Sequence, residues 1–482
     1  MNHSPKGASP KEGRHMSEQG SWQKPDDPIK HVVVLMLENR SFDHVLGCLA
    51  DELHLEGIPK SDKPRTNTDS SVGKVYAQEP GAARITNYDP HHEYEHVVYQ
   101  LRGDNSGFVD DFVQSYPRSK EPDRAEVMKY HDVGTLPALH TLARNFTVCD
   151  HWYSSLPGPT WPNRFFVHSG TSLGRVTMPE GILDANLHWY DQTTIYDRLN
   201  EKKIPWKIYY GDIPQSLALV HQLEPRNAAN YFKLRALFED AAGDAEEFPS
   251  YSFIEPAYYP PGANDAHPPH DILGADQLVA DVYNALTANS RLWQSTLLVV
   301  LFDEHGGFYD HVNPLNAVPP DFHSEEFDFK QLGVRVPAVL VSPYAPKIVG
   351  KTEFDHTSIL RYLIEKWALG SLGNRTANAK SIGILLSKEP RQDKPPRISE
   401  SSSVTELPPD PWAGVVGRVQ LNPSAHHAAL FAWTQLLETA TDVGLHDFVS
   451  RAKRVITGFD GMADVAIERV EKFLEEQKAK SQ

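Results

Sequence analysis

The chain has 482 residues, 40% of them hydrophobic, and a formal net charge of −17. This length allows one large α/β domain with appendages, or two to three domains of average size. The negative charge argues against a nucleic-acid partner, because nothing in it offsets the repulsion between the protein and phosphates.

Residues 1–29 are polar and rich in Pro, Ser, Gly and Lys, which predicts a disordered leader. This stretch lacks the apolar core of a Sec signal peptide, and no apolar run in the chain approaches membrane-spanning length. We therefore expect a cytoplasmic protein without a transmembrane segment, with export by another route left open. The two cysteines, Cys48 and Cys149, predict neither a disulfide framework nor a zinc–thiolate site; a single bridge between them stays open.

The first predicted strand is the continuous apolar run His31–Leu37, which is followed directly by Glu38 and Asn39. Such a run is typical of a central strand that is buried on both faces of a sheet. In open α/β sheets, ligands bind at the carboxyl ends of the strands. The polar cluster after this strand is therefore a candidate site, although a solvated turn is the more ordinary interpretation of any one strand end.

The next predicted elements carry fewer chemical signals. Residues 51–86 are polar and loop-like, and an Asp-Pro turn then leads into a predicted helix on which His92 and His96 share one face. Residues 136–145 predict an amphipathic helix with Pro in its first turn, and residues 146–150 predict a short strand.

A Pro-Gly-Pro loop then runs into a predicted helix start at Thr160, where free backbone N–H groups favour an anion. Farther along, a polar loop that contains His267 and His270 leads into a predicted helix near residues 274–288.

Further strands are predicted at residues 206–210, 250–254 and 297–302. The last of these repeats the plan of the first strand, because its apolar run ends directly in two carboxylates, Asp303 and Glu304. Two glycines follow them and permit a tight backbone turn.

After that turn comes His311, and residues 334–341 predict one more strand. Residues 354–367 predict a helix with His356 near its start.

Three separate strand or loop ends thus supply oxygen ligands, and such carboxylate, amide and hydroxyl groups suit a hard or borderline divalent cation. A threonine hydroxyl on such a cation becomes acidic enough to act as a nucleophile. Nearby histidines are candidates for a second metal position or for general acids, although each alone is more often a structural hydrogen bonder. The ligand candidates are Glu38, Asn39, Thr160, Asp303 and Glu304, and the histidines are His92, His267, His270, His311 and His356.

Six motifs of this chain resemble the phosphoesterase family that includes bacterial and fungal phospholipase C and the respiratory-burst-inhibiting acid phosphatase. They occur in the order found in that family, and six motifs together are far more specific than any one of them. The motifs are Glu38–Gly47, Gly158–Arg164, His267–Asp271, Asp303–Val312, Arg335–Pro337 and Asp355–Ser358.

The resemblance implies an alkaline-phosphatase-like α/β fold with a central, mostly parallel sheet flanked by helices. It also implies that Glu38, Asn39, Asp303 and Glu304 hold a divalent metal ion of unknown identity, and that Thr160, also on the metal, is the nucleophile that forms a phospho-enzyme. Some relatives carry Ser at this position.

The segment from Thr160 to Arg164 also echoes the sulfatase pattern of nucleophile-x-Pro-x-Arg. Threonine cannot be oxidised to formylglycine, so a sulfatase of that kind is not expected. In the expected mechanism Thr160 attacks phosphorus in line, His311 or His356 protonates the leaving alcohol, and water hydrolyses the phospho-threonine. The groups expected to bind the phosphate, rather than a second metal, are Arg164, His92, His267 and His270.

The resulting division of the chain places the catalytic chemistry in one long domain. The Pro- and Ser-rich residues after it predict a linker or wrapping arm, and residues 424–442 and 461–477 predict helices that pack on the body. The expected units are a leader (1–29), a phosphoesterase catalytic domain (30–384), the arm (385–412) and the C-terminal helices (413–482).

Hydrolysis of a phosphodiester, as by phospholipase C, is the favoured activity, with a phosphoester small molecule or a phospholipid headgroup as the ligand. No lipid-docking module is evident after the catalytic domain, so an acid phosphatase acting on phosphomonoesters is the close alternative. A non-catalytic phosphate- or metal-binding protein is the alternative from another class.

Overall fold

The computed structural model describes residues 27–61, 63–179, 190–324, 326–398, 424–440 and 459–481. The predicted leader, apart from its last three residues, lies outside the described residues. The same holds for residues 399–423, which include the second half of the predicted arm.

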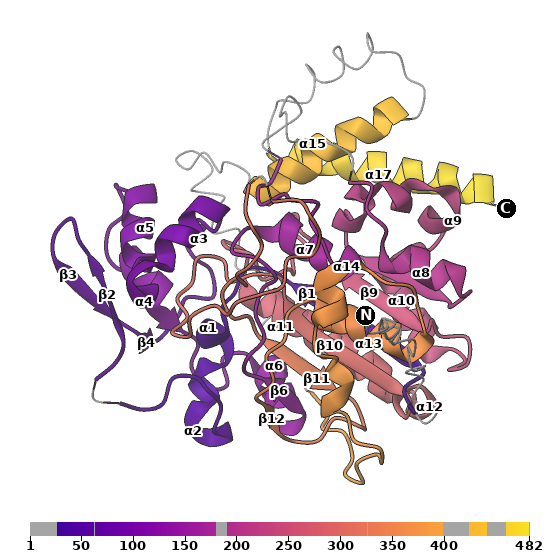
Figure 1. Ribbon diagram of the computed structural model, residues 1–482, viewed down its shortest axis with the longest axis horizontal. Coiled ribbons are helices and arrows are strands. Elements are labelled where there is room, and N and C mark those ends of the chain that lie inside the picture. Colours follow the sequence, from indigo (N-terminus) through magenta and orange to yellow (C-terminus); the bar gives the residue numbers. More distant parts are fainter. Residues whose placement is uncertain are drawn as a thin grey trace, which may run out of the picture.

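The core is an eight-stranded sheet in the order β12-β6-β11-β10-β1-β9-β7-β8 (Figure 1). All neighbouring strands run parallel except the two pairs made by β11. This confirms the predicted α/β class with a mostly parallel central sheet. The strands are β1 (His31–Leu37), β6 (Thr147–Cys149), β7 (Trp206–Tyr210), β8 (Tyr231–Lys233), β9 (Tyr251–Glu255), β10 (Thr296–Phe302), β11 (Ala338–Val341) and β12 (Val349–Gly350).

Strands β1 and β10 lie side by side in the middle of the sheet, and their register decides where the site forms. Leu37 pairs with Phe302, so both strands end at the same level. All seven residues of each strand are buried, as expected for apolar strands covered on both faces. The polar residues that follow the two strands are therefore delivered to one edge of the sheet.

Helices flank the sheet. Helix α11 packs against both α6 and α10, and helix α7 packs against α13. Figure 1 shows α1 to α5, in indigo and purple, gathered beside the sheet, and α15 and α17, in yellow, at its outer edge. The longer helices are α3 (Tyr94–Gln100), α5 (Phe108–Ser115), α6 (Pro137–Asn145), α7 (Thr160–Ser169), α8 (Ile195–Glu201), α10 (Leu234–Ala242), α11 (Ile272–Ala288), α13 (Thr357–Trp367), α14 (Gly373–Asn378), α15 (Ala425–Ala440) and α17 (Phe459–Ser481).

Short elements complete the chain. The short helices are α1 (Phe42–Leu46), α2 (Ala50–Leu53), α4 (Arg102–Asn105), α9 (Pro225–Ala228) and α12 (Ser290–Trp293), and two small sheets pair β2 (Thr66–Asp69) with β3 (Lys74–Ala77) and β4 (Glu79–Pro80) with β5 (Lys129–Tyr130).

Three sequence predictions need correction. The hairpin β2–β3 lies in the region predicted to be a loop. Its buried residues include the polar Asn67 and Asp69, so the sequence lacks the alternation of apolar and polar residues that predicts a strand. Helix α3 begins after Glu93, its N-cap residue, so His92 lies outside the helix and does not share a face with His96. Strand β11 is shorter than predicted.

The C-terminal helices α15 and α17 pack against each other, and α17 also packs on α9. Among the described residues, no helix is long and apolar enough to cross a bilayer. Both cysteines are free, so the bridge left open by the sequence is not formed.

Candidate active site

The ends of β1 and β10 build a buried acidic group, here called the strand-end cluster: Glu38, Asn39, Asp303 and Glu304. All four residues have no exposed surface. Asn39 adopts a left-handed backbone conformation, with φ at 57°, and its N–H donates to Asp303 Oδ1 at 3.1 Å. The turn after β1 is thus held by a carboxylate that follows β10.

Thr160 joins this cluster from the first position of α7. Its Oγ1 donates to Asn39 Oδ1 at 3.4 Å, and the residue is 1% exposed. One turn farther along α7, Arg164 Nη1 lies 3.5 Å from both Glu38 Oε1 and Asp303 Oδ2. The structure therefore brings together residues from three distant parts of the chain that the sequence predicted to meet.

The strand-end cluster carries more negative charge than its protein neighbours balance. Glu38 Oε2 and Glu304 Oε1 are buried without a hydrogen-bond partner. Burial, together with the charge of Asp303, raises the pKa of Glu38 well above its usual value. Burial and Glu304 likewise raise the pKa of Asp303 to about 7. Orphaned carboxylate oxygens beside an amide and a hydroxyl oxygen fit a divalent cation that prefers oxygen ligands.

The guanidinium of Arg164 lies between the carboxylates of Glu38 and Asp303. Within the described residues, three-residue groups whose ligand atoms all lie within 4.8 Å of one another occur elsewhere, as His91–Glu93–His96 and as Asp43–Asp310–His311. The carboxylates of the strand-end cluster are more widely spaced, so a cation there would draw them together.

Of the histidines predicted to bind phosphate, His92 lies nearest to the strand ends. Its Nε2 is 3.1 Å from Asn39 Nδ2 and 3.7 Å from Glu304 Oε1. His267 follows, with its ring centroid 5.9 Å from that of His92. The ring of His270 lies 6.1 Å beyond, and its Nδ1 is 2.8 Å from Asp265 Oδ1. Three imidazoles thus form a row that begins beside the strand-end cluster.

Helix α15 extends this row with two histidines that the sequence analysis missed. The His427 ring lies 5.5 Å from that of His270, and its Nε2 lies 2.6 Å from the Tyr258 carbonyl oxygen. His426 Nε2 is 3.7 Å from Glu38 Oε1, and neither nitrogen of this buried ring has a hydrogen-bond partner. The available signal was a pair of adjacent histidines at the start of an otherwise apolar helix.

His356, one of the two predicted general acids, is committed to the backbone. Its Nε2 donates to the Asp303 carbonyl oxygen at 2.7 Å, and its Nδ1 accepts from Trp152 Nε1 at 3.3 Å. Burial lowers the pKa of His356 to about 4. Both nitrogens are therefore used, and His356 positions Asp303 rather than holding a proton for a leaving group.

His311, the other predicted general acid, lies in a different cluster. Its Nδ1 is 2.8 Å from Asp43 Oδ2 and its Nε2 is 3.2 Å from Glu56 Oε1. The chain turns away after β10 at Gly306, where φ is 63° and a Cβ atom would lie 2.3 Å from the Asn39 carbonyl oxygen. After this turn His311 contacts Asp43 and Glu56, and its assignment as the acid of the Thr160 site stays a prediction.

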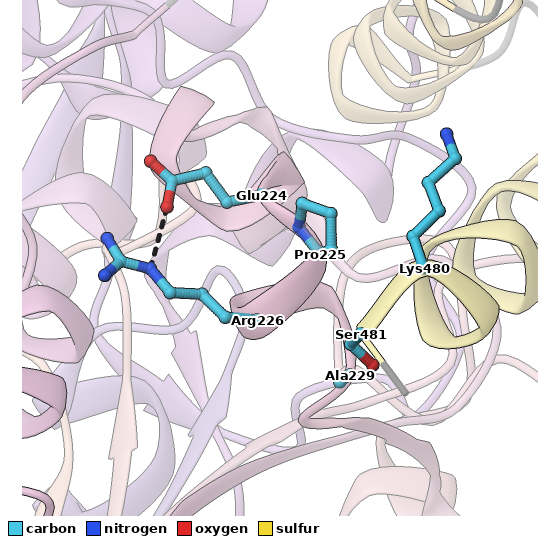
Figure 2. A pocket seen from close by; sticks show the side chains of 6 residues that line it. All are labelled: Glu224, Pro225, Arg226, Ala229, Lys480 and Ser481. Atoms are coloured by element: carbon cyan, nitrogen blue, oxygen red, sulfur yellow. Dashed lines mark ion pairs between the residues drawn. The ribbon is translucent and has the colours of Figure 1, made fainter.

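A hollow of about 560 Å³ lies elsewhere, where α9 meets the end of α17 (Figure 2). Its rim includes the ion pair between Glu224 and Arg226, at 2.8 Å. No residue of the strand-end cluster or of the histidine row lines it. The lining residues are Glu224, Pro225, Arg226, Ala229, Lys480 and Ser481.

Comparison with known proteins shows the family of this chain. A family model described as the phosphoesterase family matches residues 29–370. Non-specific phospholipase C6 of Arabidopsis thaliana is 34% identical over 421 residues, which cover 81% of this chain and 78% of that protein.

Phospholipase C B of Mycobacterium tuberculosis is 26% identical, with coverage of 82% and 85%. A solved structure described as a protein in the alkaline phosphatase superfamily, from Vibrio parahaemolyticus, matches with a TM-score of 0.31 at 12% identity, over 50% of this chain and 64% of that one. Helix α15, with His426 and His427, lies outside the matched family region.

Proposed function

We propose that this chain, which belongs to the phosphoesterase family and is a hydrolase acting on phosphoester bonds, cleaves phosphodiesters as a phospholipase C does. The proposed intermediate is a phospho-threonine at Thr160. The observation that carries this proposal is the contact between Thr160 Oγ1 and Asn39 Oδ1, 3.4 Å apart, in a buried cluster that is rich in unbalanced carboxylates. A phospholipid headgroup is the proposed substrate class, because the relatives named above are phospholipases C.

In the first step, Thr160 Oγ1 attacks phosphorus in line and the bond from phosphorus to the leaving alcohol breaks. The alcohol leaves with a proton, and the phosphorylated headgroup stays on Thr160. Water then attacks the same phosphorus, which releases the phosphorylated headgroup and restores the hydroxyl. A divalent cation held by Glu38, Asn39, Asp303 and Glu304 would lower the pKa of the threonine hydroxyl and offset phosphoryl charge.

The charge that develops on phosphoryl oxygens needs donors that are already in place. Arg164 supplies a buried guanidinium between Glu38 and Asp303. His92 faces the same cluster from another side, and we assign it a phosphate contact. With His311 placed elsewhere and His356 bound to the backbone, His92 is also our candidate for the proton of the leaving alcohol.

Two chromogenic substrates test the activity and its subclass. p-Nitrophenyl phosphorylcholine reports phosphodiester cleavage, and p-nitrophenyl phosphate reports monoester cleavage. We expect a higher kcat/KM on the diester, loss of both activities on chelation of divalent ions, and their return on adding ions back. A higher kcat/KM on the monoester would instead favour the acid phosphatase, and inactivity on both with every ion tried would favour a non-catalytic binder.

Variants at the nucleophile test the intermediate. Thr160→Ala is expected to abolish turnover and Thr160→Ser to retain part of it, whereas Thr141→Ala, a half-buried threonine in α6, serves as the matched control. Acid quenching during turnover of p-nitrophenyl phosphorylcholine, followed by mass spectrometry, is expected to find phosphorylcholine on Thr160. Wild-type kcat/KM in Thr160→Ala would overturn the assignment.

The acid phosphatase alternative has one observation in its favour. Thr160 is 1% exposed and Asp303 is fully buried. The residues that cover them must therefore move less to admit a small phosphomonoester than to admit a lipid headgroup. Elemental analysis of the purified protein identifies the bound ion in either case.

A further inference from the structure

We propose that His91, Glu93 and His96 form a second cation site, for a borderline divalent ion such as Zn²⁺, next to the strand-end cluster. His91 and Glu93 precede α3, and His96 lies in its first turn. One ligand atom from each residue lies within 4.8 Å of the other two. These three residues are called the His-Glu-His cluster below.

The ring of His96 is oriented by a buried carboxylate. Its Nδ1 is 2.7 Å from Asp111 Oδ1, and because a carboxylate accepts only, this nitrogen carries the proton of the neutral ring, whose Nε2 then keeps its lone pair. Asp111 is 5% exposed, and its other oxygen accepts from Gln100 Nε2 at 2.8 Å. A carboxylate behind the outer nitrogen is the arrangement that proteins use to orient a histidine ligand towards a metal.

The ring of His91 stacks on that of His96, with centroids 4.5 Å apart and an angle of 29° between the planes. His91 Nδ1 is 3.0 Å from Glu93 Oε2, and neither ring uses its Nε2 in a hydrogen bond to the described part of the chain. Two stacked imidazolium ions would repel each other, whereas two neutral rings can share one cation. The three side chains are 33–36% exposed, so an ion can enter from solvent.

The ligand set distinguishes this site from the strand-end cluster. Two imidazole nitrogens and one carboxylate suit Zn²⁺ and its neighbours in the transition series, with water in the remaining position. The strand-end cluster offers oxygen atoms only. The two sites are therefore expected to prefer different ions.

The His-Glu-His cluster is tied to the candidate active site at two points. Glu93 Oε2 also accepts from the backbone N–H of His92 at 3.2 Å, and His92 faces Asn39. Gln100 Nε2 donates to the His91 carbonyl oxygen at 2.7 Å, and its Oε1 lies 2.8 Å from Nε2 of His305. An ion bound here would hold the segment that carries His92 against the strand ends.

Titration of the full-length protein with Co²⁺, followed by visible absorption, tests the site. Wild type is expected to show a saturable signal of cobalt bound to imidazole, and His96→Gln is expected to lose it. His323→Gln is the matched control, because His323 Nδ1 lies 3.0 Å from Asp321 at 30% side-chain exposure but belongs to no three-ligand group of the described residues. Asp303→Asn is expected to keep the signal, because it shares no residue with the cluster.

Asp111→Asn leaves all three ligands in place and removes only the orienting charge, so it is expected to weaken cobalt binding roughly 10- to 100-fold. Glu93→Gln carries the test if His96→Gln unfolds. The proposal is overturned if wild type gives no saturable signal, or if the folded variant at His96 or Glu93 binds with wild-type affinity. The Thr160 variants test the phosphoesterase proposal separately, and their result does not bear on this site.

Discussion

Two buried acidic clusters in this protein lie beyond the ends of the same two strands, but they differ in how far neighbouring cations offset their negative charge. Each combines a residue that follows β1 with one that follows β10. In the strand-end cluster, oxygens of Glu38 and Glu304 have no partner. In the second, called the Arg335 cluster, Arg335 lies 2.9 Å from Asp310 Oδ1 and 3.1 Å from Asp43 Oδ1.

In the second cluster, neighbouring cations stabilise the charge of Asp43. Burial would raise the pKa of Asp43, but the hydrogen bond from His311 and the charge of Arg335 hold it below its usual value. Asp43, Asp310 and His311 have the spacing of a metal site, yet Arg335 already supplies the positive charge. Close spacing of acids therefore does not distinguish the candidate active site from the Arg335 cluster; the excess of negative charge does.

The largest expected effect separates the two clusters by activity. Asp303→Asn removes a charge from the strand-end cluster and is expected to lower kcat/KM about 1000-fold, because transition-state charge loses its electrostatic support. In chelator-treated protein, the same change is expected to raise the free energy of unfolding by about 2 kcal/mol, because one of several repelling charges is gone. Steady-state kinetics and urea unfolding measure both effects; a less stable variant would contradict the charge excess.

The Arg335 cluster is expected to respond in the opposite way. Arg335→Met leaves Asp310 buried without its cation and Asp43 with His311 as its remaining cationic partner, which is expected to lower the free energy of unfolding by about 3 kcal/mol. Arg84→Met is the control, because its ion pair with Asp271 is half-exposed and worth under about 1 kcal/mol. Equal losses in the two variants would mean that the Arg335 cluster is not a balanced network.

A smaller effect is expected where α15 meets the strand-end cluster. His426→Ala removes the unpartnered imidazole beside Glu38 and is expected to lower kcat/KM about 10-fold, the smaller end of what a polar group near the reacting phosphate contributes. His323→Ala is the control for loss of a histidine outside the site. Unchanged kinetics in His426→Ala would confine the site to the matched family region.

The smallest expected effect is the pH dependence of the Arg335 cluster. Burial would lower the pKa of His311, but Asp43 raises it above the usual value. The stabilisation that protonated His311 contributes is therefore complete below pH 6.5 and is lost as the pH rises through the pKa of His311 in the folded protein. Urea unfolding is expected to show a stability difference between wild type and His311→Gln that is about 1 kcal/mol larger at low pH than at high pH. If His311→Gln instead lost as much activity as Asp303→Asn, the two clusters would form one site.

The sequence by itself determined the local elements of the site. The apolar runs of β1 and β10 are long and β-branched enough to predict buried strands, and the carboxylates that end them were visible at once. Thr160 was placed at a helix start by the Pro-Gly-Pro loop before it. These features depend on neighbouring residues and on burial alone, so they can be read without the fold.

Only the tertiary structure decided which of the remaining groups serve the site. The turn at Gly306 carries His311 to Asp43, His356 spends both nitrogens on buried partners, and α15 brings His426 to Glu38 across nearly the whole length of the chain. Each outcome depends on which distant group satisfies a hydrogen bond or a charge. That pairing is set by three-dimensional packing, and spacing along the chain does not encode it.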